Sequence, residues 1–307
     1  MRILTLAILL TLALAGDASS APRDSAYATS IAQWRAEREA QLKADDGWLT
    51  VVGLTWLKPG VSRVGSDPAN EVLLPKSAPR LAGTLTLANG KVVFKPGPHL
   101  TPHAVMIDNQ PAYETELHPD VDPMYTRVVA GPVKFFIIQR DDDHGEKFGV
   151  RIKDNESAAR REFTGKKWFP IDPSWRVTAR YIPFDKPRQL TFDTVAGVKE
   201  TDESPGYVQF DRSGREYRMD AVVDGKSLWF IMRDATSGKS TYAAARFLYA
   251  EMPKNGLKQA GPVTIDFNKA ENPPCVFTPY ATCPLPPPQN RLTLAVTAGE
   301  QMYGHQH

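Results

Sequence analysis

The 307-residue chain lacks any uninterrupted apolar run long enough to cross a bilayer, and only two of its residues are cysteines. A membrane-spanning helix needs about 20 apolar residues, and the longest apolar stretch, residues 3–15, falls short of that. We therefore expect no transmembrane segment. The chain also lacks the Gly-x-Gly-x-x-Gly and Walker loops that cradle nucleotide phosphates, and the Gly-x-Ser-x-Gly elbow of serine hydrolases. These absences leave no support for a nucleotide cofactor or a serine triad.

A large excess of charge of one sign is also missing. Lys and Arg number 37 against 35 Asp and Glu, a formal net charge of +2, and the two signs are interspersed. Nucleic-acid binding proteins gather positive charge on one face, so we expect no nucleic-acid partner. The histidines show no metal-site spacing, because Pro98 and Pro102 exclude the helix that would bring His99 and His103 together. We expect no metal and no cofactor.

The beginning of the chain has the features of an export signal. A basic residue precedes the apolar run, and small residues at Ala13 and Ala15 suit signal peptidase. We predict a signal peptide over residues 1–15. A lipoprotein would have a cysteine after Leu-Ala-Gly, where this chain has Asp17. We therefore expect a periplasmic or secreted protein of bacterial envelope type, without a lipid anchor.

Hydrophobic spacing predicts one helix followed by strands. Residues 24–44 carry apolar side chains among charged ones at the spacing of an amphipathic helix. From residue 47 onward, short β-rich runs alternate with turn residues, and 26 prolines argue against further helices. Residues 211–214 and Asp224-Gly225 are typical hairpin turns. We expect an all-β protein with a β-sandwich over residues 47–160 and a second antiparallel β domain over residues 168–307.

Several motifs resemble domain-of-unknown-function family 1684, whose members are bacterial proteins, often exported, without an established activity. The resemblance covers nearly the whole mature chain and implies membership without implying a function. Its motifs are Asp46-Gly47-Trp48-Leu49, the segment from Gly53 to Leu57, Phe163-Thr164-Gly165, the segment from Arg233 to Gly238, Thr241-Tyr242, and the segments over residues 265–275 and 283–292.

A second, local resemblance lies in the amino-terminal half. Residues 64–75 are similar to the start of a forkhead-associated domain, a β-sandwich that reads phosphothreonine. Such domains place an arginine directly after the first glycine, where this chain has Ser66, and a Ser-x-x-His near Ser77, where Arg80 and Leu81 follow instead. The resemblance implies the β-sandwich fold of these domains for the amino-terminal half. Because the phosphate-binding arginine is missing, we do not expect the phosphothreonine activity.

A cluster of polar residues in the carboxy-terminal half is the candidate site. Strand ends and turns can direct such side chains into one cleft. Asp234 and Asp266 are the candidate catalytic carboxylates, and Arg246 is a natural partner for Asp266. A structural ion pair between Arg246 and Asp266, with Asp and Asn capping turns, is the favoured alternative. The candidate ligand-binding residues are Arg246, Tyr242, Thr236, Asn268, Asn272, Asn290 and Arg291, and Glu300 belongs to the same cluster.

The two cysteines and the tryptophans each allow two interpretations. Cys275 and Cys283 enclose a short segment in a chain expected to enter an oxidising compartment, which favours one local disulfide. A thiol nucleophile or a metal pair is the alternative, but the spacing is not that of a zinc site. The six tryptophans could form a carbohydrate platform, although singly spaced tryptophans in strands are more often part of the core.

Two functions remain open at this point. The leading hypothesis is an envelope protein that binds an unknown small molecule or an envelope protein partner, with the site in the carboxy-terminal β domain. The alternative is a hydrolase that uses Asp266 or Asp234, with Arg246 positioning an anionic or sugar substrate.

Overall fold

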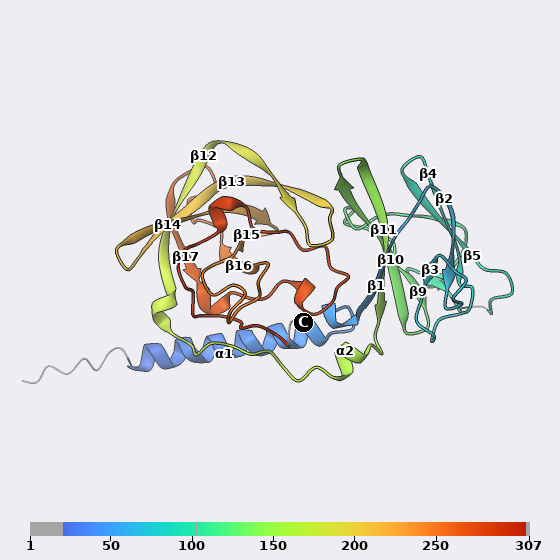
Figure 1. The fold of residues 1–307 in the computed structure, drawn as a ribbon, viewed down its shortest axis with the longest axis horizontal. Coiled ribbons are helices and arrows are strands. Elements are labelled where there is room, and N and C mark those ends of the chain that lie inside the picture. The colour runs from blue at the N-terminus through green and yellow to red at the C-terminus, as the bar shows by residue number, and fades with distance from the viewer. Residues whose placement is uncertain (1–20, 102, 305–307) are drawn as a thin grey trace, which may run out of the picture.

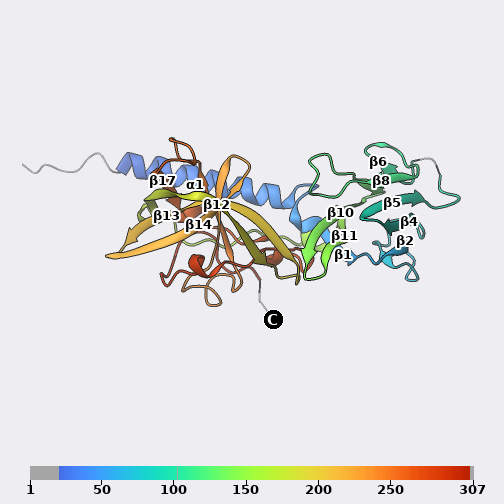
Figure 2. The same ribbon diagram turned by 90° about the horizontal axis from the view of Figure 1, so that it is seen from above.

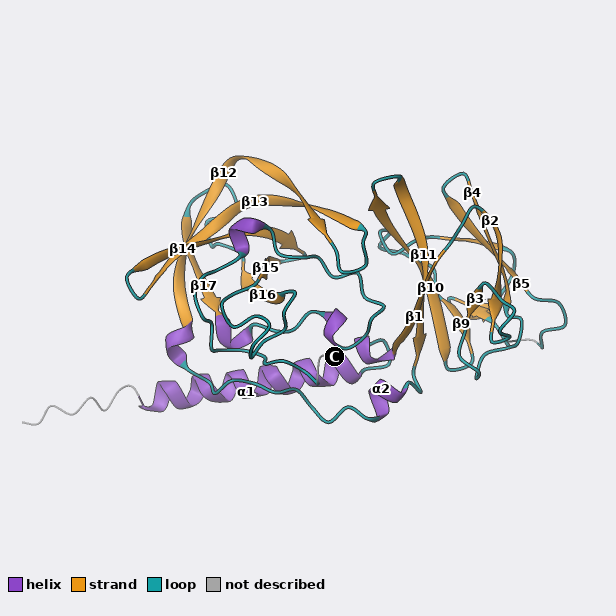
Figure 3. Ribbon diagram, in the orientation of Figure 1, coloured by secondary structure: helices purple, strands orange, loops and turns teal. Residues whose placement is uncertain are grey.

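The computed structural model describes residues 21–101 and 103–304, so the expected signal peptide and the last two histidines lie outside the described residues. One long helix, α1 (Ala21–Lys43), precedes a chain that is mostly strand (Figures 1 and 3). The expected helix over residues 24–44 is confirmed. In this part of the chain, no helix is long and apolar enough to cross a membrane.

The amino-terminal half is a β-sandwich, at the end of the molecule away from most of α1 (Figure 1). The edge-to-face contact of Phe94 and Phe135, with ring centroids 5.8 Å apart, joins its two sheets across a shared apolar core. One sheet has the order β3 (Val72–Leu73), β2 (Gly60–Gly65), β4 (Gly83–Ala88), β5 (Lys91–Pro96) and β8 (Thr115–Leu117). The other contains β1 (Val51–Trp56), β11 (Gly145–Asp154), β10 (Val133–Asp142), β9 (Val128–Ala130), β6 (Met106–Ile107) and β7 (Gln110–Pro111).

The carboxy-terminal half is a curved antiparallel sheet of six strands. Phe210, Trp175 and Phe267 pack together within a separate apolar core inside the curve. The strand order is β16 (Arg246–Glu251), β15 (Ser227–Met232), β14 (Arg215–Asp224), β13 (Lys199–Arg212), β12 (Arg176–Asp193) and β17 (Gly261–Asp266). The expected all-β class with one amino-terminal helix is therefore correct.

Both predicted hairpin turns are present. Ser213 and Gly214, which join β13 to β14, have φ values of 53° and 74°, and Gly225, which joins β14 to β15, has a φ of 57°. A positive φ favours glycine and small polar residues, which explains why the sequence marks these turns. The remaining helical pieces are short: α2 (Ala158–Arg161), η1 (Trp48–Thr50), η2 (Pro173–Trp175), η3 (Phe267–Lys269), η4 (Pro274–Val276) and η5 (Pro288–Asn290).

The six-stranded sheet does not close on itself. Its two terminal strands, β16 and β17, lie near each other, but no ladder pairs them among the described residues. We call the gap between them the seam. Helix α1 runs along this half of the molecule (Figures 1 and 2), and its Ile31 is completely buried. The helix that precedes the sandwich in sequence therefore packs on the other half of the chain.

Candidate functional site

The candidate residues Asp234 and Arg246 form a buried ion pair. Arg246 Nη1 lies 2.9 Å from Asp234 Oδ2, and neither side chain is exposed. Arg246 also donates to the backbone carbonyl groups of Val296 and Ala298, while Asp234 accepts hydrogen bonds from the amide and hydroxyl groups of Thr236. The expected pairing of Arg246 with Asp266 was wrong. A strand pattern shows which face a side chain occupies, but it does not show which distant segment packs on that face.

A second group of charges, in which Lys166, Glu271 and Glu300 are buried and Arg38 is partly exposed, ties α1 to the carboxy-terminal segment. Lys166 Nζ lies 3.0 Å from Glu300 Oε2 and 4.0 Å from Glu271 Oε2. Arg38 of α1 donates to both carboxylate oxygens of Glu271, at 2.8 and 2.5 Å. Burial raises the pKa of Glu300 even though Lys166 lowers it. The charges of two cations and two carboxylates cancel in this group, as is typical of an ion-pair network that supports the fold.

Asp266 lies apart from these pairs and faces α1. Its carboxylate accepts hydrogen bonds from Tyr27 of α1, at 2.9 and 3.0 Å, and from the amide nitrogen of Asn268 at 3.1 Å. Burial, followed by the charge of Asp266, raises the pKa of Tyr27, so its hydroxyl group stays protonated and donates. No hydrogen bond or ion pair joins Asp266 to Asp234 in the described part of the chain. The two candidate carboxylates therefore belong to different surroundings.

A pocket of about 660 Å³ opens beside Asp266, where α1 covers the seam. Its wall combines one face of the helix with the edges of β16 and β17, so segments from both ends of the chain form it. The lining residues are Tyr27, Ser30, Ile31, Trp34 and Arg38 of α1, with Arg176, Ser227, Tyr249, Ala250, Glu251, Met252, Lys254, Pro262, Val263, Thr264, Asp266, Lys269 and Glu271.

The pocket has cations that no carboxylate neutralises. Arg38 is paired with Glu271, but Arg176, Lys254 and Lys269 form no ion pair with any described residue. Glu251 is likewise unpaired, and Asp266 is held by neutral donors. The net charge of the residues that line the pocket is therefore slightly positive. Lys269 also lies over the ring of Trp34, 5.9 Å from its centroid, so aromatic and cationic surfaces adjoin.

Most of the other predicted site residues support loops. Asn290 donates to the carbonyl groups of Asp220 and Ile231, Arg291 donates to that of Pro286, and Asn272 donates to that of Gln301. Asn268 turns toward Asp266, whereas Thr236 supports Asp234. The structure thus places Asp266 in the lining of the pocket. Asn268 is buried behind it and donates to its carboxylate, and the other candidates belong to the fold's internal contacts.

The two cysteines lie together as free thiols. The backbone amide of Cys275 donates to Cys283 Sγ at 3.2 Å. Contact with Cys283, offset in part by burial, lowers the pKa of the Cys275 thiol, and the hydroxyl group of Tyr242 contributes in the same direction. The predicted disulfide therefore has its partners in contact, and its formation stays a prediction.

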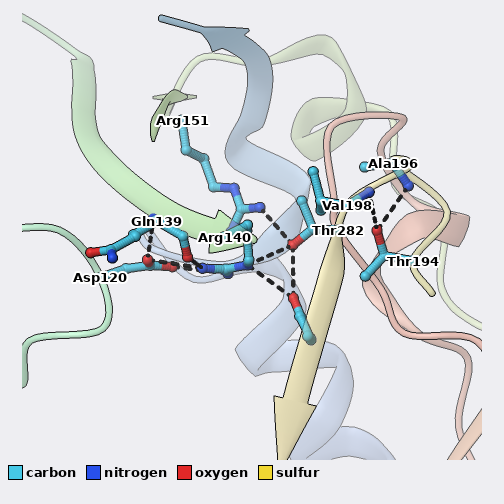
Figure 4. Close-up of polar contacts among 9 residues, drawn as sticks. Asp120, Gln139, Arg140, Arg151, Thr194, Ala196, Val198 and Thr282 are labelled. Carbon is cyan, nitrogen blue, oxygen red and sulfur yellow. Dashed lines mark hydrogen bonds and ion pairs between the residues drawn. The ribbon is translucent and has the colours of Figure 1, made fainter. Parts of the chain in front are cut away.

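One charged cluster was missed by the sequence analysis because its residues come from five separate segments. Arg140 of β10 binds both oxygens of Asp120 at 3.0 Å and also Glu200 of β13 at 2.9 Å. Thr282 bridges Arg140 and Arg151, as Figure 4 shows. The cluster lies where the two halves meet, next to Asp141 and Lys199, the one ladder pair that joins β10 to β13. No local pattern in the sequence signals it.

Comparisons with known proteins give a family and no activity. The model of DUF1684, described as a protein of unknown function, matches residues 161–301. A solution NMR structure of an uncharacterized protein from Haloarcula marismortui is 32% identical, with the match covering 46% of this chain and 78% of that one, at a TM-score of 0.40. No curated protein matches the chain. The resemblance to forkhead-associated domains stays a prediction.

Proposed function

We propose that this chain is an exported binding protein whose ligand occupies the pocket between α1 and the seam. The chain belongs to the DUF1684 family of proteins of unknown function. One observation carries the proposal: a pocket of about 660 Å³ lies where an amino-terminal helix covers an unclosed sheet. This size is typical of ligand sites, which fall between about 300 and 1,000 Å³. The predicted signal peptide accounts for export, and a Cys275–Cys283 disulfide would suit an oxidising compartment.

The arrangement of the charges favours binding over catalysis. Arg246 is fully buried and bound to Asp234, so it has no contact with the pocket and is not placed to position a substrate. The carboxylate of Asp266 already accepts hydrogen bonds from Tyr27 and Asn268, which are neutral donors. These hydrogen bonds fix the position of the carboxylate, which suits it to orient neighbouring residues and ligands.

The alternative hydrolase function retains one supporting observation. Asp266 lines the pocket, and it is the only one of the two candidate catalytic carboxylates that does so. In that case Asp266, with the unpaired cations of the pocket, would act on an anionic or sugar substrate. The variant Asp266→Asn separates the two functions: a compound that still binds but is no longer cleaved indicates hydrolysis.

A ligand screen by thermal shift on the mature protein tests the proposal. A specific ligand raises the melting temperature because it stabilises only the folded state, by about 2.7 kcal/mol at 100 times its Kd. The variant Ser30→Trp introduces a bulky ring on a helix residue that lines the pocket, and Thr29→Trp introduces the same ring on its exposed neighbour outside the pocket. Hits should stabilise the wild type and Thr29→Trp but not Ser30→Trp. Equal stabilisation of both variants, or a screen in which neither small molecules nor peptides are hits, contradicts the proposal.

A further inference from the structure

The edge of β16 that borders the pocket has no partner strand. Phe247 exchanges two backbone hydrogen bonds of 2.9 Å with Glu271, on the side away from β15. In a strand, every second residue turns its amide and carbonyl groups to the same side. Tyr249 and Glu251 therefore also point their backbone groups away from β15, toward the seam.

The segment around Glu271, which begins to pair with β16, turns away from the edge of β16 after one residue pair. Glu271 opposes Phe247, but the preceding residues form the short helix η3 (Phe267–Lys269) and never reach the positions opposite Tyr249 and Glu251. Neither residue forms a further backbone hydrogen bond on that side with any described residue, and β17 does not pair with β16. The empty positions coincide with the pocket, because residues 249–252 line it.

An unpaired strand edge is a template for another strand. Residues Pro262 to Thr264 of β17 border the far side of the pocket, while Ile31 and Trp34 of α1 cover it. The pocket therefore offers backbone donors and acceptors along one wall and side-chain contacts along the others. Recognition by strand addition uses these two kinds of contact, main-chain bonds for affinity and side-chain pockets for specificity.

We propose that the ligand of this pocket is an extended peptide segment of a partner protein, which pairs with the free edge of β16 at Tyr249 and Glu251. This inference rests on the proposed function, since it names the class of ligand for the same site. Arg176, Lys254 and Lys269, which have no carboxylate partner, favour a segment that contains acidic residues. The peptide continues the line that Glu271 begins, along the free edge of β16 where Tyr249 and Glu251 border the pocket.

Selection from a displayed library of random dodecapeptides against the mature protein supplies the probe. Each selected peptide is then synthesised with a methyl group on one backbone nitrogen at a time. Strand pairing predicts a period of two: methylation at alternate positions weakens binding about tenfold or more, since each lost main-chain bond and the accompanying clash exceed about 1.4 kcal/mol. The intervening positions tolerate the methyl group. Amide hydrogen exchange should slow at Tyr249 and Glu251 when the peptide is bound.

A matched pair of variants tests the backbone directly. Glu251→Pro removes the amide that faces the seam, and Glu251→Ala removes the side chain but keeps the amide. We expect the first to lose binding and the second to retain it, with both variants checked for an unchanged melting temperature. If peptides bind without a period of two, or Glu251→Pro binds as well as Glu251→Ala, strand pairing is wrong although the pocket is still a binding site. If the selection yields no peptide while small molecules are hits that Ser30→Trp abolishes, the peptide class is wrong and the proposed function stands.

Discussion

Arg246 and Asp234 form an ion pair that excludes solvent completely, with Nη1 and Oδ2 2.9 Å apart and both side chains unexposed. Burial lowers the pKa of Arg246, and the charge of Asp234 raises it in return. The same guanidinium binds the carbonyl groups of Val296 and Ala298, near the end of the chain. The pair therefore attaches the last segment of the chain to β16.

Breaking this pair should destabilise the protein strongly. We expect Arg246→Met to lower the free energy of unfolding by about 3–5 kcal/mol, because it leaves the carboxylate of Asp234 buried without its partner. Urea denaturation monitored by tryptophan fluorescence measures the change. The control is Arg63→Ala, whose ion pair with Glu71 is about half exposed and should change the free energy of unfolding far less. Equal losses for the two variants would show that burial does not determine the contribution.

The exported protein should contain a disulfide between Cys275 and Cys283. Thiol titration under denaturing conditions should find no free thiol, and full reduction should find two. In the chain-entropy model, a loop this short contributes roughly 2.5 kcal/mol, so Cys283→Ser should lower the stability of the oxidised protein by about that amount and leave that of the reduced protein nearly unchanged. Free thiols in freshly exported protein would contradict the prediction.

The sandwich should not bind phosphothreonine. Arg63 is paired with Glu71, Arg80 is paired with Asp67, and the hydroxyl group of Ser66 donates to the carbonyl of Ala78. Both nearby arginines are therefore neutralised, and a contact worth about 1.5–3 kcal/mol to a phosphate is missing. Titration with phosphothreonine peptide libraries should show no saturable binding. Micromolar binding that disappears on dephosphorylation would refute this.

Alkaline pH should destabilise the protein through Tyr181. Burial raises the pKa of this completely buried residue to about 12, against 10.0 for an ordinary tyrosine. Between these values the unfolded chain has released the proton and the folded chain retains it, so stability falls as pH rises through this window. The Tyr181→Phe variant should show a shallower decline in urea midpoint from pH 10 to 12. Tyr113→Phe, an exposed control, should follow the wild type, and identical slopes for all three proteins would exclude Tyr181 as the cause.

The mature protein should begin at or near Gly16. Ala13 and Ala15 occupy the small-residue positions that signal peptidase requires before the cut. Intact-mass measurement on protein exported from a bacterial host gives the answer. A mass that retains Met1, or one increased by a lipid, would rule out this site and this type of signal.

The local pattern of the sequence determined the secondary structure of this protein. Apolar spacing predicted the helix that forms as α1, and Gly214 and Gly225 marked the turns that join β13, β14 and β15. These features depend on backbone preferences and on the period of the apolar residues, which each segment carries by itself. The motifs of the carboxy-terminal half likewise identified the family.

Only the tertiary structure decided the partners of the charged residues and the place of the pocket. Tyr27 donates to Asp266, 239 residues later, and Arg246 binds Asp234 while Asp266 faces α1. The sheet leaves β16 and β17 unpaired, and α1 packs over that seam although it precedes the sandwich in the chain. Such contacts depend on which faces of distant segments bury each other. The apolar pattern of one sequence is compatible with many pairings of these faces, and only close packing selects one of them.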